Sequence, residues 1–383
     1  MPNDQIRKRY FFHTLLHKFT EQLFFAFGAL LIYAKTGSIL GTLLFVVIGH
    51  AATLLMKSVG FGPSVALFKK WGLVPSMTFG LVLKVIALVG IFYLLPEHSY
   101  FYAILFFLHV IENIGNTLYV VGANTIMITV IGASSAPGYS SAQITSLHTL
   151  SGLVAAITGI FLHTQASFLY LFLIGSAVLL GSTIPLSGIP TPELPRLSFW
   201  KNLKTISMPM FLANFEPSHP LKIVGLPLII LTLSRSFDIS IWITAGIAIL
   251  SVIAAYLAGW VKDHNRSWVI WLALCIGILS WVGYGLVHLP VAFLFITVFH
   301  VLATEIINVS REARMGTELR GNVLGGTMAF EFARAAGILL GSGILLIAYL
   351  IFGHLPQLIL VIGGLPLIPK ALYAVGKYAD PSA

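Results

Sequence analysis

Charge and cysteine are both scarce in this sequence. Only 9% of its 383 residues are Asp, Glu, Lys or Arg, and Cys275 is the single cysteine, so no internal disulfide can form. The sequence also lacks a phosphate-binding Gly-Lys-Ser/Thr loop, paired cysteines for zinc and a Gly-x-Ser-x-Gly nucleophile elbow. We therefore expect no enzymatic activity, no cofactor and no metal. The polar loops are too small to hold an ATPase, so a gradient must supply any driving force.

Apolar residues dominate instead. They make up 57% of the chain, and the mean hydropathy is +0.94. A soluble fold of this length has too little interior to bury so much apolar surface, which makes lipid the expected solvent. Stretches of about 20 apolar residues predict an all-α integral membrane protein with about twelve transmembrane helices. The expected spans are 10–33, 37–57, 71–95, 99–122, 141–163, 166–187, 208–233, 238–260, 267–287, 289–309, 323–350 and 355–376.

Basic residues are distributed unevenly between the loops. Lys35 and Arg235 stand on one side, whereas the alternate loops hold most of the others. Those are Arg7, Lys8, Arg9, Lys57, Lys69, Lys70, Arg196, Lys201, Lys204, Lys262, Arg266, Arg311, Arg314, Arg320, Lys370 and Lys377. By the positive-inside rule, both termini and the central linker are cytoplasmic, in the cell (inner) membrane. Because these clusters are short and flank apolar runs, the net charge of +9 does not indicate a nucleic-acid partner.

A polar, proline-rich stretch at 187–205 divides the spans into two equal groups. We expect an N-terminal six-helix bundle over 1–187, a cytoplasmic linker over 188–207 and a C-terminal six-helix bundle over 208–383. Similar elements follow the second span of each half. They consist of Gly62, Ala66, Lys69 and Lys70 in the first half and of Gly259, Asp263 and Arg266 in the second. Internal duplication of this kind is typical of secondary transporters.

The two six-span halves, the cytoplasmic linker and this Gly-x-x-x-Asp-x-x-Gly-Arg-like element resemble the major facilitator superfamily over the whole chain. The resemblance implies two pseudo-symmetric bundles and a charge network that gates the cytoplasmic side. The gating residues that it implies are Gly62, Lys69, Lys70, Gly259, Asp263 and Arg266. The first copy has Ala66 where the family has an aspartate, and Arg266 stands where the family has a second glycine. The arginine and Gly-Pro signatures of its proton-driven drug antiporters are absent, so the chain does not resemble that subgroup.

Nine ionisable residues lie inside the apolar spans. They are Lys18, Glu21, Lys84, Glu112, Glu216, Lys222, Glu305, Glu331 and Arg334. A charge at the bilayer centre costs roughly 2.5–3.5 kcal/mol even on lenient insertion scales. Such residues persist where they face a bundle interior or a wet cavity. Their number and their nearly balanced signs indicate a solute pathway through a membrane.

The first span carries polar residues on one helix face. His13, His17 and Glu21 follow each other at four-residue spacing, with Lys18 beside Glu21. A carboxyl group in low dielectric with an ammonium nearby is poised to load and unload a proton. Alternatively, Lys18 and Glu21 form an intrahelical pair that only stabilises packing.

The fourth span places His109, Glu112 and Asn116 on one face, and no lysine or arginine shares that face. Glu112 must therefore find a cation on another helix, be protonated, share a proton with His109 or touch the solute. The structural alternative is a hydrogen-bonded unit of His109 and Glu112 that joins two helices. We expect Glu21 or Glu112 to be the proton-coupling carboxyl group.

The seventh span contains Pro217 and Pro220, which are hard to fit into an unbroken helix. A discontinuous helix is tolerated in a membrane where its backbone lines a cavity or is packed in protein. Glu216 and Lys222 then flank the break. The alternative is a simple kink.

The tenth and eleventh spans add further polar groups. His300 lies in the tenth span, and Glu331 and Arg334 form a third-neighbour pair in the eleventh. The superfamily resemblance places the eleventh span behind those that line the cavity, so we expect this pair to be structural or gating.

We expect a monomeric secondary active transporter that moves a small solute by alternating access and is coupled to protons. The predicted pathway residues are Lys18, Glu21, His109, Glu112, Glu216, Lys222 and His300. Lys18 and Lys222 can bind an anionic group on the solute, whose identity the sequence leaves open. One alternative is a polytopic membrane enzyme that acts on a lipid or lipid-linked sugar. Another is a non-transporting sensor or scaffold.

Overall fold

The computed structural model describes most of the chain. The described residues are 5–20, 37–59, 61–93, 100–132, 134, 136–165, 168–189, 204, 206–221, 252–264, 266–287, 290–319 and 323–375. Glu21 and Lys222, two of the predicted pathway residues, lie outside them. Lys35, Arg235 and most of the predicted linker also lie outside them. Within the described residues the regular structure is helical and contains no strand.

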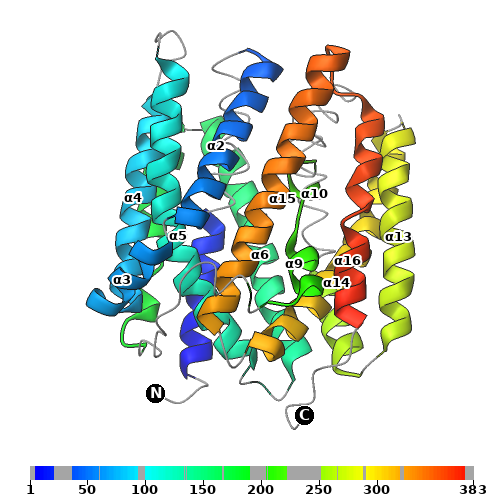
Figure 1. The fold of residues 1–383 in the computed structure, drawn as a ribbon, viewed down its shortest axis with the longest axis horizontal. Helices are drawn as coiled ribbons and strands as arrows, with labels where there is room; N and C mark the ends of the chain where they lie inside the picture. Colours follow the sequence, from blue (N-terminus) through cyan, green and yellow to red (C-terminus); the bar gives the residue numbers. More distant parts are fainter. Residues whose placement is uncertain are drawn as a thin grey trace.

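The first half consists of long helices that run side by side (Figure 1). A helix over residues 5–20 is followed by α2 Ile39–Val59, α3 Phe61–Trp71, α4 Leu73–Tyr93, α5 Phe101–Gly132, α6 Pro137–Gln165, α7 Phe168–Gly181 and the 3-10 helix η1 Ile184–Leu186. α4 and α5 approach each other closely at Gly80 and Gly115. A Cβ atom added at Gly80 would lie only 2.5 Å from the carbonyl oxygen of Gly115. Small residues at such crossings let helix backbones pack against each other in membranes.

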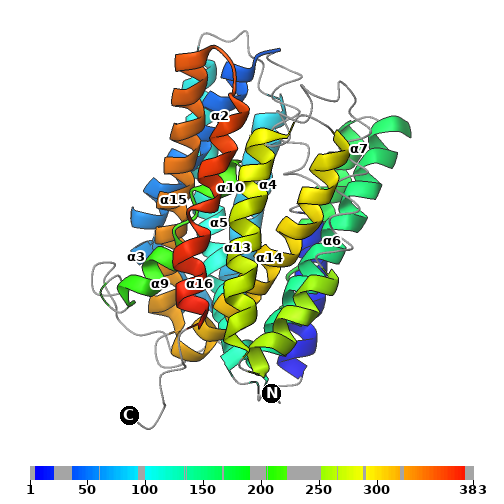
Figure 2. The same cartoon turned by 90° about the vertical axis from the view of Figure 1, so that its right-hand side faces the viewer.

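The second half begins with two short helices and continues with long ones. These are α9 Met208–Asn214, α10 Ser218–Pro220, a helix over residues 252–263, α13 Ser267–Leu286, α14 Pro290–Glu318, α15 Val323–Phe352, the 3-10 helix η4 Gln357–Gly364 and α16 Leu367–Val375. α14 packs against both α13 and α6 and thereby joins the two halves (Figure 2). The helix over residues 5–20 begins, and α16 ends, at the same end of the bundle (Figure 1), which we call the basal end.

Six of the described helices are long and apolar enough to cross a membrane. They contain the segments Ile39–Val59, Leu73–Ile91, Phe101–Ile131, Ser267–Leu286, Gly325–Phe352 and Gln357–Val375. These segments coincide with the predicted second, third, fourth, ninth, eleventh and twelfth spans, so the sequence predicted helices correctly at these places. α6 and α14, of 29 residues each, cover the predicted fifth and tenth spans.

The predicted break in the seventh span is confirmed. α9 ends at Asn214, and Phe215 adopts extended backbone angles (φ −77°, ψ 104°) before α10 begins at Ser218. The break packs against glycines of α15, where added Cβ atoms would lie 2.3 Å from the Glu216 nitrogen and 2.0 Å from the Pro217 oxygen. Only residues without a side chain allow this backbone approach, and α15 supplies them at Gly337 and Gly341.

An additional helix, α3, joins α2 to α4 near the basal end (Figure 1). Val65 and Phe68 are buried on one face, whereas Lys69 and Lys70 in the last turn are exposed. The element that the sequence analysis compares with a superfamily gate therefore forms an amphipathic helix in the first half. Gly62 lies in its first turn.

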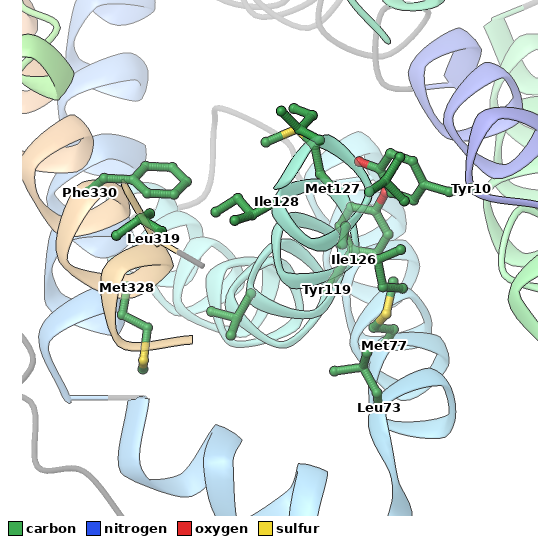
Figure 3. Packing of buried hydrophobic residues seen from close by; sticks show 14 of the residues in the cluster. Tyr10, Leu73, Met77, Tyr119, Ile126, Met127, Ile128, Leu319, Met328 and Phe330 are labelled. Atoms are coloured by element: carbon green, nitrogen blue, oxygen red, sulfur yellow. The ribbon is translucent and has the colours of Figure 1, made fainter. Parts of the chain in front are cut away.

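The larger hydrophobic core contains residues from both halves. Ile128 lies near the basal end of α5, beside Leu319 and Phe330 from the second half (Figure 3). Met328 and Met315 from the second half belong to the same cluster. A second cluster is formed mainly by the second half, with residues of α2 added. Apolar packing thus joins the halves at the basal end.

Candidate functional site

Glu331 connects the two halves through polar contacts about two turns inside α15. Its carboxylate forms an ion pair with Lys57 at the end of α2 and accepts a hydrogen bond from Asn124 Nδ2 of α5 at 3.0 Å. Arg334 Nη1 lies 4.0 Å from the same carboxylate, which is the third-neighbour pair that the sequence indicates. The side chain of Glu331 is only 4% exposed. A buried carboxylate of one half is therefore held by groups of the other half.

Glu216, at the break between α9 and α10, lies among three cations. Arg311 Nη1 of α14 and Lys370 Nζ of α16 lie 2.9 and 2.7 Å from its Oε1 atom. Arg334 Nε of α15 lies 3.2 Å from its Oε2 atom. A buried carboxylate is tolerated when it is paired and hydrogen-bonded in this way. Glu216 therefore ties the broken helix to three neighbouring helices.

Two cations of this cluster correct the sequence analysis. Arg311 and Lys370 are counted there among the loop bases, but they lie inside α14 and α16 and are buried. α14 continues to Glu318, well beyond the predicted end of the tenth span. Burial of a lysine and an arginine is tolerated here because both contact the Glu216 carboxylate.

The charge cluster also reaches α6 of the first half. Arg311 Nη2 lies 3.7 Å from Glu312 Oε1, and Glu312 accepts a hydrogen bond from Ser141 Oγ at 3.0 Å. We define the charge cluster as Lys57, Glu216, Arg311, Glu312, Glu331, Arg334 and Lys370. It contains four cations and three carboxylates and has contacts with both halves.

Asp263 and Gly259, two of the predicted gating residues, meet the first half at the basal end. Asp263 accepts hydrogen bonds from the backbone N–H groups of Gly138 and Tyr139, at 2.9 and 2.8 Å. These residues open α6, so the carboxylate lies where the helix dipole favours a negative charge. A Cβ atom at Gly259 would lie 2.8 Å from the Gly138 oxygen, so a glycine is required there. Arg266 is exposed at the start of α13.

In the first half, His109 and Glu112 form the pair that is one of the arrangements allowed by the sequence. His109 Nδ1 lies 2.9 Å from Glu112 Oε2, and the Glu112 side chain is 15% exposed. Gly49 of α2 leaves room for the His109 ring, since a Cβ atom there would lie 3.1 Å from Cε1. Lys84 and His50 also interact electrostatically with Glu112.

A further polar contact between the halves lies farther from the basal end. His50 Nδ1 of α2 lies 2.5 Å from Ser342 Oγ of α15. Ser342 Oγ donates its own proton to the Ile338 carbonyl oxygen at 2.9 Å, so His50 Nδ1 must be the donor in this contact. His50 is not among the predicted pathway residues, because a lone histidine on an apolar helix is usually a satisfied core residue.

The histidines of the first span pack against neighbouring helices. His13 Nδ1 lies 2.6 Å from the Ser182 carbonyl oxygen, and its Nε2 lies 2.8 Å from the Tyr119 hydroxyl. Because the carbonyl can only accept, Nδ1 carries the proton and Nε2 accepts from Tyr119. His17 stacks on the Tyr119 ring at 3.9 Å. Lys18 of the same helix is half-buried.

His300 of α14 lies within the second half. Its ring contacts Trp281 and Tyr284 of α13, with ring centroids 5.1 and 5.4 Å apart. Both aromatic residues belong to the core cluster formed mainly by the second half. The structure does not bring the described pathway residues together at one place. Lys18 lies on the helix over residues 5–20, His109 and Glu112 lie on α5, Glu216 lies in the charge cluster and His300 lies in the second-half core.

No protein-family model and no curated protein matches this sequence. Two solved structures have a similar fold. One is the human organic anion transporter MFSD10 (TETRAN), with a TM-score of 0.69 and 14% identity over 98% of this chain and 100% of that chain. The other is the major facilitator superfamily proton:xylose symporter XylE, with a TM-score of 0.69 and 15% identity over 97% of this chain and 94% of that chain.

The chain has the fold of the major facilitator superfamily transporters, and the resemblance drawn from the sequence is confirmed. At these identities the similarity establishes the fold and not the solute. Together with the six apolar helices, the fold makes the chain an integral, multi-pass membrane protein.

Proposed function

We propose that the protein is a secondary active transporter that moves a small solute by alternating access, and that it is not an enzyme. One observation carries this proposal: Glu331 of the second half is held inside the bundle by Lys57 and Asn124 of the first half. A charge away from water needs partners. Contacts of this kind join two bodies firmly, yet they can be exchanged for water when the bodies separate.

The proposed architecture has twelve spans in two six-helix bundles. The bundles cover 1–187 and 208–383, with a linker over 188–207, and the superfamily fold supports this division. We place the basal end in the cytoplasm of the cell (inner) membrane, as the bias of basic residues favours. The contacts of Asp263 with the start of α6 and the apolar core at Ile128 then close the cytoplasmic side. We propose that the protein works as a monomer.

We further propose that transport is coupled to protons at Glu112. Its closest partner is the imidazole of His109, at 2.9 Å, and imidazoles are common partners of carboxyl groups in proton transfer. Protonation of Glu112 removes the cost of burying its charge when the pathway closes. The structural neighbour XylE is a proton symporter, which supports this type of coupling for the fold.

The test uses purified protein in liposomes with an imposed pH gradient. Solutes are screened by the proton flux that they induce, recorded with a pH-sensitive dye inside the vesicles. Glu112→Gln is expected to abolish this flux because the amide cannot take up a proton. The matched control is Glu318→Gln, which removes a carboxylate that pairs with Arg314 at 2.6 Å near the basal end and should keep the flux. Undiminished flux in Glu112→Gln would remove Glu112 from the proposed role.

A further inference from the structure

Arg334 points toward the protein interior. It shares a face of α15 with Gly337 and Gly341, which pack against the broken helix. The Glu331 side of α15, next to that face, contacts the first half. Leu340, an exposed apolar residue, lies on another side of α15. Arg334 therefore lies between the broken helix and the first half.

The Arg334 side chain is the most exposed of the cations in the charge cluster. It is 43% exposed, whereas the side chains of Arg311 and Lys370 are 10% and 8% exposed. Because Arg334 faces inward, the exposed part of its guanidinium is placed where a solute that enters between the halves can contact it.

The carboxylates of the cluster are held more closely by other cations than by Arg334. Arg311 and Lys370 lie 2.9 and 2.7 Å from Glu216, against 3.2 Å for Arg334. Arg334 is 4.0 Å from Glu331, which also has Lys57 as a partner. With four cations to three carboxylates, the cluster has an excess of positive charge. A guanidinium has five N–H donors, and its planar fork matches a carboxylate or a phosphate.

We propose that the transported solute is an anion, and that Arg334 binds its carboxylate, phosphate or sulfonate group. The inference rests on the proposed transport function and names its substrate class. Glu216 is the resident anion that competes with the solute for Arg334. The sequence analysis expected Arg334 to be structural or gating, because the superfamily resemblance places the eleventh span behind those that line the cavity.

The binding test is ligand-induced thermal stabilisation of the full-length protein in detergent. The probes are sodium benzoate, sodium phosphate and sodium methanesulfonate, each compared with sodium chloride at equal ionic strength. At least one probe is expected to raise the unfolding temperature of the wild type more than chloride does. Arg334→Gln should weaken the apparent affinity for that probe at least tenfold, and Arg334→Lys should weaken it less. The control Arg314→Gln removes a half-buried arginine that pairs with Glu318 outside the cluster, and it should respond as the wild type does.

The Glu216→Gln variant tests whether Arg334 binds anions, because the proposal predicts the direction in which the affinity for the probe changes. Removal of the competing carboxylate should increase the affinity for the same probe several-fold, although the variant is less stable without it. If the contact between Arg334 and Glu216 were only structural, the two variants would be destabilised alike and neither would change the response to anions. Equal responses of Arg334→Gln and the wild type, or no probe that stabilises the wild type beyond chloride, would overturn the proposal.

Transport assays separate this inference from the proposed function. Uptake of a neutral or cationic solute into liposomes, unchanged by Arg334→Gln, would overturn the anion proposal and leave the transporter standing. Binding of an anion that depends on Arg334, without flux of that anion into sealed vesicles, would overturn the transport function and leave the anion site. Uptake of the bound probe that is lost in Arg334→Gln and kept in Arg314→Gln supports both.

Discussion

Glu112 and Glu216 are both carboxylates inside the bundle, but their partners differ in kind. Glu112 pairs with His109 at 2.9 Å. Glu216 lies among two arginines and a lysine. A histidine can lose its charge near neutral pH, whereas an arginine cannot. The first-half carboxylate is therefore paired with a type of side chain that can be neutral, whereas the second-half carboxylate has two guanidinium groups as partners, which stay charged. The chemistry of the neighbours, and not burial alone, decides which role a membrane carboxylate can take.

The largest expected effect is a difference in stability between variants of Glu216 and Glu112. Glu216→Gln leaves Arg311, Lys370 and Arg334 without their shared anion, and loss of one partner from a buried ion pair costs about 3–5 kcal/mol. Glu112→Gln keeps a hydrogen-bonding group beside His109, so its cost should be roughly 1 kcal/mol. Thermal unfolding of both variants in one detergent measures the difference. Equal losses would contradict the contrast.

An intermediate loss of stability is expected from a substitution at Gly341, where α15 packs closely against the backbone of the broken helix. A Cβ atom at Gly341 would lie 2.0 Å from the Pro217 oxygen, so Gly341→Ala must displace the broken helix that carries Glu216. Overpacking of this kind costs about 1–3 kcal/mol.

The matched control on the same helix is Gly343→Ala. A Cβ atom there has no atom of its surroundings within 4 Å, and alanine is the better helix former. This variant should be as stable as the wild type or more stable. If both alanines gave the same unfolding temperature, the packing of the break against α15 would not matter for stability.

The smallest effect is expected at the basal contact between the halves. Asp263→Ala removes the acceptor for the Gly138 and Tyr139 N–H groups, and loss of such a cap costs about 1 kcal/mol. Asp263→Asn keeps an acceptor but loses the interaction of the charge with the helix dipole, which is worth about 0.5 kcal/mol. Unfolding temperatures should therefore fall in the order wild type, asparagine, alanine. A lower unfolding temperature for Asp263→Asn than for Asp263→Ala would argue against a capping role of Asp263.

Features that are local in the sequence were predicted well. Runs of apolar residues predicted the six helices that are long enough to cross a membrane. The break at Glu216 and the contact of His109 with Glu112 were each among the alternatives that Pro217, Pro220 and helical spacing left open. Each of these depends on neighbours within about two helical turns, where geometry is fixed by the backbone.

Contacts between helices could not be predicted in the same way. Lys57 and Arg311 stand at or beyond the ends of predicted apolar runs, and Lys370 lies near the end of the last one. Nothing in their local sequence links these bases to Glu331 or Glu216. The choice of partner depends on how distant helices cross, which apolar periodicity does not specify. One signal was present: a third-neighbour pair of Glu331 and Arg334 inside a span indicates that further charges must be near.

The two amide groups that Asp263 occupies at the start of α6 have a consequence for motion. Any movement that draws the helix over residues 252–263 away from α6 strips Gly138 and Tyr139 of their acceptor. N–H groups that are exposed at the start of a helix need another hydrogen-bond acceptor, and water can provide it at this end of the molecule. Separation of the halves here and hydration of the α6 terminus are therefore one event, so the first molecules to enter between the bundles from this side would be water.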